Sequence, residues 1–189
     1  MNKVVLITGG ARGIGSAIAL ELAKHGYDIV INYLTSKQPA KELKEKIESQ
    51  YHVRCLTICA DVSDVDQVNI MVSEIEEKMG GVDVLINNAA VDLSNLFHLK
   101  NAEEFKRTLD VNVVGAFNCS KRVYKHMLDQ EYGRIINISS TNGINTYYPM
   151  CIDYDASKAA LISMTHNLAA EFGPVSYTHL RAHETLRHL

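Results

Sequence analysis

Short runs of hydrophobic residues recur along the chain, separated by longer stretches with a different pattern. The runs cover residues 4–8, 28–32, 53–59, 82–87 and 134–139. Each run is continuous and does not alternate with polar residues, as is typical of strands buried on both faces of a sheet. We therefore predict a set of parallel, fully buried β-strands.

The stretches between these runs place hydrophobic residues on one side and charged residues on the other, as amphipathic helices do. Such segments occupy residues 14–26, 37–50 and 65–81, and two longer ones cover about 101–130 and 154–172. Strand and helix thus alternate. This order predicts an α/β fold, a doubly wound parallel sheet of the Rossmann type with right-handed crossovers.

Composition is typical of a globular protein with a sizeable core, since 47% of the 189 residues are hydrophobic and 22% are charged. We expect one nucleotide-binding domain over residues 1–174. The formal net charge of −3 offers no broad basic field, so we expect neither nucleic acid nor a membrane surface as a partner. No secretory signal or membrane-spanning run is recognised, which favours a cytoplasmic location.

Cysteines and histidines give little reason to expect metal or disulfide chemistry. The four cysteines are scattered without a C-x-x-C pair, which is typical of reduced thiols in a packed interior. The histidines before residue 175 are not spaced as metal ligands usually are. We therefore predict no metal site.

A glycine-rich turn, "TGGARGIG", follows the first predicted strand and begins the first helix. Glycines permit a tight turn, close approach of the backbone to a pyrophosphate and close packing of the helix, whose N-terminus attracts the anion. The alternative is a plain structural turn. The predicted cofactor-binding residues here are Thr8, Gly9, Arg12, Gly13, Ile14 and Gly15.

The end of the second strand bears on the choice of cofactor. An acidic residue there would bind the adenosine ribose and repel a 2′-phosphate, but the position holds Asn32. Arg12, Ser36 and Lys37 supply groups suited to a phosphate. The sequence therefore favours NADP(H) over NAD(H), with Asn32 and Ser36 as cofactor-binding residues; Lys37 is equally well explained as a solvated residue at a helix start.

A tyrosine and a lysine lie four residues apart in "YDASK", Tyr154 and Lys158, and so share one face of a predicted helix. A nearby ammonium group stabilises a phenolate and lowers its pKa from about 10, which suits the phenol to acid-base chemistry. Upstream, "NISSTNG" places hydroxyl groups at the carboxyl edge of the sheet, where ligands bind in such folds.

These motifs, together with "ADV" at 60–62, "NNAA" at 87–90 and "VN" at 111–112, resemble the short-chain dehydrogenase/reductase family. They occur in the family's order over nearly all of residues 3–174. The resemblance implies hydride transfer between a nicotinamide and a substrate carbonyl or alcohol carbon.

The resemblance also implies roles for four residues. Tyr154 would give a proton to the substrate oxygen, and Ser140 would orient that oxygen. Lys158 would bind the nicotinamide ribose and lower the tyrosine pKa, while Asn112 would hold a water that links Lys158 to solvent. Ser140 fits the family spacing better than Ser139 does.

At the cofactor, the resemblance implies that Asp61 and Val62 contact the adenine end. Asn87, Asn88 and Ala89 would support the sheet edge beside the cofactor. Tyr154 and Lys158 complete the predicted cofactor-binding set.

The expected substrate is a small-molecule or acyl-carrier-linked carbonyl compound, most plausibly a 3-oxoacyl thioester on acyl carrier protein. A sugar, polyol or steroid alcohol dehydrogenase of the same family is the main alternative, and a non-catalytic nucleotide sensor is another. The resemblance implies a homo-oligomer in the full-length parent, through the helical regions 101–130 and 154–172; those regions are also explained by covering the sheet.

The last stretch, residues 175–189, departs from the family pattern, which continues with a sixth strand and a Pro-Gly turn. Residues 175–185 are identical to a translated sequencing-library adapter, so we expect a non-native tail and a fold that lacks the family's last strands. His179 and His183 have a spacing compatible with metal binding, but we do not expect a site. The fifth strand would then be an apolar edge prone to aggregation, and the chain would have little activity.

Overall fold

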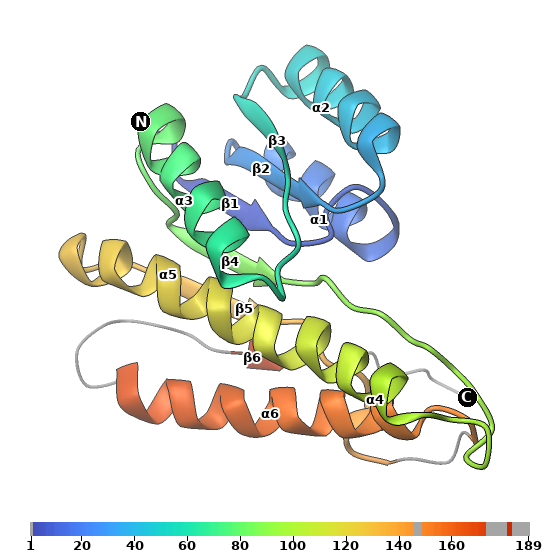
Figure 1. Ribbon diagram of the computed structural model, residues 1–189. Helices are drawn as coiled ribbons and strands as arrows, with labels where there is room; N and C mark the ends of the chain where they lie inside the picture. The colour runs from blue at the N-terminus through green and yellow to red at the C-terminus, as the bar shows by residue number, and fades with distance from the viewer. Residues whose placement is uncertain (1, 146–148, 173–180, 183–189) are drawn as a thin grey trace.

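The protein is described by a computed structural model, which covers residues 2–145 and 149–172 and the backbone of residues 181–182. Its strands form one parallel sheet in the order β3-β2-β1-β4-β5-β6 (Figure 1). The strands are β1 (Val4–Ile7), β2 (Asp28–Tyr33), β3 (Cys55–Cys59), β4 (Val84–Asn87), β5 (Arg134–Asn137) and β6 (Arg181–Ala182). The order reverses beside β1, which confirms the predicted doubly wound α/β fold.

Helices follow the strands as the hydrophobic pattern predicts. They are α1 (Gly13–Lys24), α2 (Lys37–Tyr51), α3 (Val65–Met79), α4 (Ala102–Leu109), α5 (Gly115–Asp129) and α6 (Ile152–Phe172), with a 3₁₀ turn η2 (Thr141–Gly143) before α6. The region 101–130 is not one regular helix. A π-helical turn, η1 (Asp110–Val114), joins α4 to α5, and the whole stretch runs alongside α6 (Figure 1).

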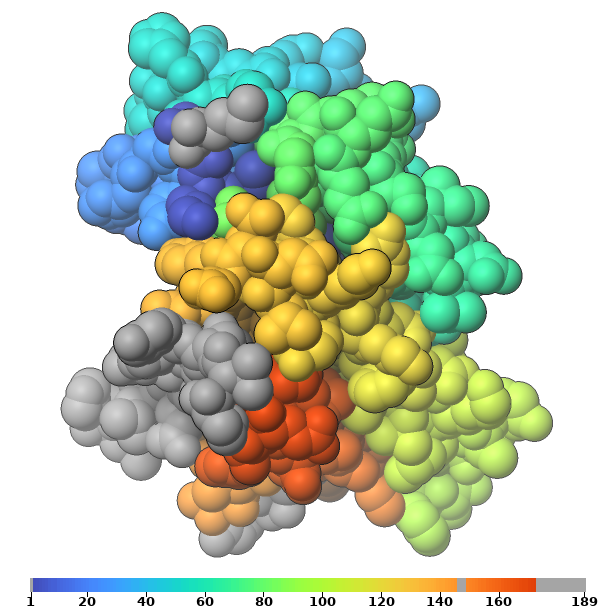
Figure 2. All heavy atoms as spheres, turned by 90° about the vertical axis from the view of Figure 1, so that its left-hand side faces the viewer, coloured from blue at the N-terminus to red at the C-terminus, as the bar shows by residue number. Residues whose placement is uncertain are grey.

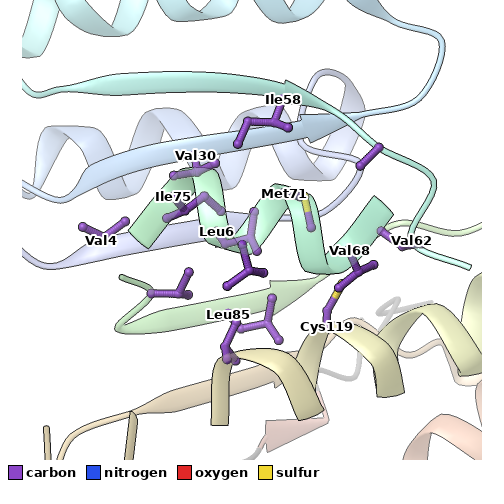
Figure 3. Packing of buried hydrophobic residues seen from close by; sticks show 14 of the residues in the cluster. Val4, Leu6, Val30, Ile58, Val62, Val68, Met71, Ile75, Leu85 and Cys119 are labelled. Carbon is purple, nitrogen blue, oxygen red and sulfur yellow. The ribbon is translucent and has the colours of Figure 1, made fainter. Parts of the chain in front are cut away.

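The hydrophobic core lies on both faces of the sheet, because successive strand residues point to opposite sides. Val5 and Ile7 of β1 pack with residues of α1 and α2 on one face. Val4 and Leu6 pack with α3 and α5 on the other, and Figure 3 shows Leu6 beside Met71 and Ile75 of α3. Burial on both faces is the physical reason for the continuous hydrophobic runs.

Capping residues fix where two of the helices begin. Asp64 accepts hydrogen bonds from the backbone N–H groups of Asp66 and Gln67 at the start of α3. Asn101 and Glu104 form a reciprocal capping box at the start of α4. Both caps satisfy backbone N–H groups that would otherwise lack a partner at the start of a helix.

One short piece of the tail is described. Arg181 and Ala182 form the two-residue strand β6, which pairs in parallel with Ile136 and Asn137 of β5. The rest of the sheet is the doubly wound parallel sheet that the sequence predicts. The other residues of the tail, including its three histidines, His179, His183 and His188, lie outside the described residues.

The space-filling view shows how the halves of the chain are arranged. In Figure 2 the first 60 residues lie at one end of the molecule and α6 at the other, with α5 and the residues that follow it between them. None of the described helices is long and apolar enough to cross a membrane.

Candidate active site

A cavity of about 620 Å³ lies where the carboxyl ends of β1, β2, β3 and β4 meet. This is the position at which open α/β sheets bind their ligands, and the volume lies in the usual range of small-molecule sites. Predicted cofactor residues that line it are Gly9, Arg12, Gly13, Asn32, Ser36, Asp61, Val62, Asn88 and Ala89. Thr8, Ile14 and Gly15 are not among the lining residues.

Three positions of the first turn require glycine, each for a different physical reason. A Cβ on Gly9 would lie 2.9 Å from Ala89 Cα, and one on Gly15 would lie 2.7 Å from Asn88 Nδ2. Gly13 has open space around it but a φ of +54°, which disfavours other residues. The turn is therefore pressed against the loop after β4, and only its cavity side remains open.

Thr8 and Asn88 tie the turn to β4 from beneath. Thr8 Oγ1 accepts hydrogen bonds from the backbone N–H groups of Asn88 and Ala89, each at 3.0 Å. The Asn88 amide donates to the carbonyl oxygens of Thr8 and Gly9. Thr8 is buried, so its contribution to the cavity is indirect, whereas Ile14 is exposed at the start of α1.

Asn87 immediately precedes Asn88 and is the last residue of β4. Its side-chain amide donates to Asn137 Oδ1 at 2.8 Å and to Ser120 Oγ at 3.1 Å. These bonds link β4 to β5 and to α5, consistent with the supporting role that the resemblance implies.

Asn32 lines the cavity, but both polar atoms of its side chain already form hydrogen bonds within the protein. Its Oδ1 accepts from the Gly9 N–H at 3.3 Å, and its Nδ2 donates to the Ala60 carbonyl at 3.0 Å. The Asn32 amide thus braces the glycine turn against the residue that follows β3, while Asn32 remains part of the cavity wall. The segment 33–36 that follows also lines the cavity.

Arg12 supplies the free positive charge of the cavity. It stands at the N-cap of α1, and its guanidinium has no hydrogen bond or ion pair with any residue the structure describes. Ser36, at the N-cap of α2, makes no capping bond with its side chain. A cation and a hydroxyl at two helix N-termini fit the phosphates of a dinucleotide.

Arg107 also lines the cavity, and the sequence alone did not single it out. Its NH2 donates to Asp61 Oδ2 at 2.9 Å and its NH1 to Ser63 Oγ at 2.8 Å. Burial raises the pKa of Asp61, but hydrogen bonds from Ser63 and Arg107 outweigh it and hold the pKa below its usual value. In the sequence, Arg107 looks like any exposed arginine of an amphipathic helix.

The second group of predicted residues lies on and beside α6. Lys158 Nζ lies 5.5 Å from the centroid of the Tyr154 ring and donates to the Ile138 carbonyl at 2.7 Å. Ser140 Oγ accepts from the Asn142 N–H at 3.2 Å, and the Ser140 hydroxyl lies near enough to the Tyr154 phenol to lower its pKa. Ser139 Oγ instead donates to the backbone carbonyl of Lys158 at 3.1 Å. Of the two serines, Ser140 is therefore the one that faces the tyrosine.

The pKa values of this pair reflect burial. Burial raises the pKa of Tyr154, the Ser140 hydrogen bond opposes this, and the charges of Asp92 and Asp155 raise it further. Burial lowers the pKa of Lys158 to about 8. In this geometry desolvation dominates and the Lys158 ammonium group donates to the Ile138 carbonyl, so the pKa of Tyr154 lies above its ordinary value.

Asn112 connects the two groups of residues. It is buried in η1; its Oδ1 accepts from the Val91 N–H at 2.8 Å, and its Nδ2 donates to the Val91 carbonyl at 3.0 Å and to Ser157 Oγ at 2.9 Å. Val91 lines the cavity, and Ser157 precedes Lys158. With these three bonds, the side chain braces the site and has little capacity left for a bound water.

No cluster of three or more histidine, cysteine or acidic side chains able to hold a metal occurs among the described residues.

The glycine turn, the cavity and the tyrosine-lysine pair together define a nucleotide-binding oxidoreductase of the Rossmann type. Residues 3–178 match the short chain dehydrogenase family. The chain belongs to this family, whose members are NAD(P)-dependent short-chain dehydrogenases and reductases.

The chain is also similar to individual proteins. The chain is 39% identical over 171 residues to the 3-oxoacyl-[acyl-carrier-protein] reductase FabG of Staphylococcus aureus, covering 90% of this chain and 69% of that protein. It is 36% identical over 171 residues to the acetoacetyl-CoA reductase of Paracoccus denitrificans, covering 90% and 68%. A crystal structure from Sinorhizobium meliloti, provisionally described as a short-chain alcohol dehydrogenase, superposes with a TM-score of 0.87 at 28% identity, covering 97% and 71%.

Proposed function

We propose that the protein uses NADP(H) to reduce a carbonyl group, and that its substrate is a 3-oxoacyl thioester carried by acyl carrier protein. The observation that carries the proposal is the Ser140–Tyr154–Lys158 cluster, which the Asn112 brace joins to the dinucleotide-sized cavity. A bound nicotinamide would supply the hydride. Tyr154 would protonate the substrate oxygen, Ser140 would orient it, and Lys158 would hold the nicotinamide ribose.

Four features support NADP(H) as the cofactor. Among the residues that the structure describes, the Arg12 guanidinium has no partner, and the Ser36 hydroxyl at a helix N-terminus makes no hydrogen bond. The residues from Asn32 to Lys37, at the end of β2, include no carboxylate that would repel a 2′-phosphate. Within the described lining of the cavity the one carboxylate, that of Asp61, is engaged by Ser63 and Arg107.

The substrate class is supported by the relatives. The Staphylococcus aureus protein is named for reducing 3-oxoacyl groups on acyl carrier protein, and the Paracoccus denitrificans protein for reducing acetoacetyl-CoA. Both names describe a 3-oxo thioester, and they differ in the carrier. A cytoplasmic location and a homo-oligomeric assembly belong to the same proposal.

The test compares the wild-type protein with Tyr154→Phe, using the longest reading frame that contains this chain. NADPH consumption is followed with 3-oxoacyl groups on acyl carrier protein and on coenzyme A. We expect turnover with the thioesters and a loss of about 100-fold to 10,000-fold in kcat for Tyr154→Phe, the range for removing a general acid. NADPH binding, followed by its fluorescence, should be unchanged. Full turnover by the variant would refute the assignment of Tyr154, and binding without turnover by the wild type would favour a nucleotide sensor.

A further inference from the structure

We infer that Arg107 is a cofactor-binding residue, and that its guanidinium plane forms the surface on which the adenine ring of the dinucleotide rests. The inference rests on the proposed function, since it assigns a part of the same cavity. It concerns a side chain on α4, far in sequence from the glycine turn and from the residues that follow β2.

Position is the first argument. Arg107 lines the cavity together with Ala60, Val62 and Val111, which present apolar side chains. Its guanidinium bonds to Asp61 and Ser63 in the segment after β3, on the side of the cavity that the family resemblance assigns to adenine. A flat, largely apolar base needs broad contact surface there, and small aliphatic side chains supply only part of it.

Charge is the second argument, because the two arginines of the cavity are in opposite situations. The Arg12 guanidinium has no partner among the described residues, so its charge is available to a phosphate. The Arg107 charge is balanced by Asp61 at 2.9 Å, and a pair of this kind attracts a further anion only weakly. Arg107 is therefore better suited to recognise a neutral ring than a phosphate.

Preorganisation is the third argument. Two hydrogen bonds, from NH1 and from NH2, fix the guanidinium plane before any ligand arrives. The side chain nevertheless keeps 41% of its surface exposed, so its anchoring leaves contact area for a ligand. Arginine stacks on aromatic rings through its planar, weakly hydrated guanidinium, whereas lysine presents only a point charge.

The experiment measures dissociation constants of Arg107→Lys and Arg107→Met for NADPH, NADH and ADP-ribose, using the whole chain. Lysine keeps the ion pair with Asp61 but loses the plane, so both variants should weaken all three ligands by about tenfold. The ratio of the NADPH and NADH constants should stay at its wild-type value, because the 2′-phosphate is not involved. In Arg12→Met that ratio should instead fall towards one.

A matched control exists on the same molecule. Arg122 makes a two-pronged ion pair with Glu76, and neither residue lines the cofactor cavity. Arg122→Lys should leave all three constants unchanged. Wild-type affinity in Arg107→Lys would overturn the inference in favour of a purely structural ion pair, and a loss confined to NADPH would overturn it in favour of phosphate binding. If the wild-type chain bound neither nicotinamide cofactor, the proposed function itself would fail.

Discussion

Lys158 is a buried cation whose ammonium group makes its only hydrogen bond among the described residues to the Ile138 carbonyl. Burial lowers its pKa to about 8 from an ordinary value of 10.5. Between these two pH values the unfolded chain binds more protons than the folded one, so this residue makes stability rise with pH. Below pH 8 both states carry the charge, and the cost of burying it is present in full.

The first prediction concerns this rise of stability with pH. Relative to Lys158→Met, the wild-type protein should gain free energy of unfolding as the pH rises from 7 to 10, by about 1–3 kcal/mol. Urea denaturation of both proteins without cofactor measures the difference, in which the titration of all other groups cancels. A difference that does not change with pH would show that the ammonium group is well solvated or well paired in the folded state.

Residue identity alone predicted part of this chemistry. Tyr154 and Lys158 were found because their spacing puts both on one helical face, and the structure places them together. The direction of the tyrosine pKa could not be read from spacing, since it depends on burial and on Asp92 and Asp155. Arg107 escaped notice because its importance lies in a contact with Asp61, 46 positions away.

At the scale of elements, a buried ion pair joins the loop before α4 to the start of α6. Lys100 Nζ lies 3.0 Å from each carboxylate oxygen of Asp153, and the two side chains are only 5% and 0% exposed. Thr108 Oγ1 of α4 donates to the same carboxylate at 2.6 Å. Because Asp153 precedes Tyr154, the pair holds the start of α6 against α4 and against the loop that ends at Lys100.

The second prediction concerns the loss of one partner. Lys100→Met leaves a buried carboxylate uncompensated and should lower the free energy of unfolding by about 3–5 kcal/mol. The double variant Lys100→Met/Asp153→Leu should recover a large share of the loss, because it removes the orphaned charge as well. Chemical denaturation of both proteins tests this.

Lys106→Met is the surface control, since Lys106 pairs with Asp110 while remaining 75% exposed. Its effect on the free energy of unfolding should stay below about 1 kcal/mol. Equal losses in Lys100→Met and Lys106→Met would mean that the buried pair contributes no more than an exposed one.

The pattern of hydrophobic positions located the elements but not their irregularities. The runs at 4–8 and 28–32 became β1 and β2 because burial on both faces of the sheet favours hydrophobic side chains at Val4–Ile7 and at Ile29, Val30 and Ile31. The π-helical turn at Asp110–Val114 has no such signature: one extra residue in a helix changes neither composition nor the apolar face by much. The π-helical turn contacts α6, and its Asn112 bonds to Val91 in the loop after β4. These are tertiary contacts, which the local sequence pattern does not predict.

For the molecule as a whole, the cofactor cavity is a property of the first two thirds of the chain. Its described lining residues lie between Gly9 and Val111, whereas Ser140, Tyr154 and Lys158 come later in the chain. Asn112 links the two parts, because it bonds to Val91 of the cavity and to Ser157 beside Lys158. Cofactor binding and turnover thus depend on different stretches of the chain and can be tested separately.

The last prediction uses that separation. A ligand that binds only the folded state adds about 2.7 kcal/mol of stability at 100 times its dissociation constant. For a chain of this size NADPH at that excess should raise the melting temperature by about 5–10 °C, since 1 kcal/mol corresponds to about 2–4 °C. NADH at the same concentration should give a smaller increase, because it lacks the 2′-phosphate that Arg12 would bind. The difference between the cofactors should largely vanish in Arg12→Met, whereas an equal increase with both cofactors in the wild type would remove the case for NADP(H).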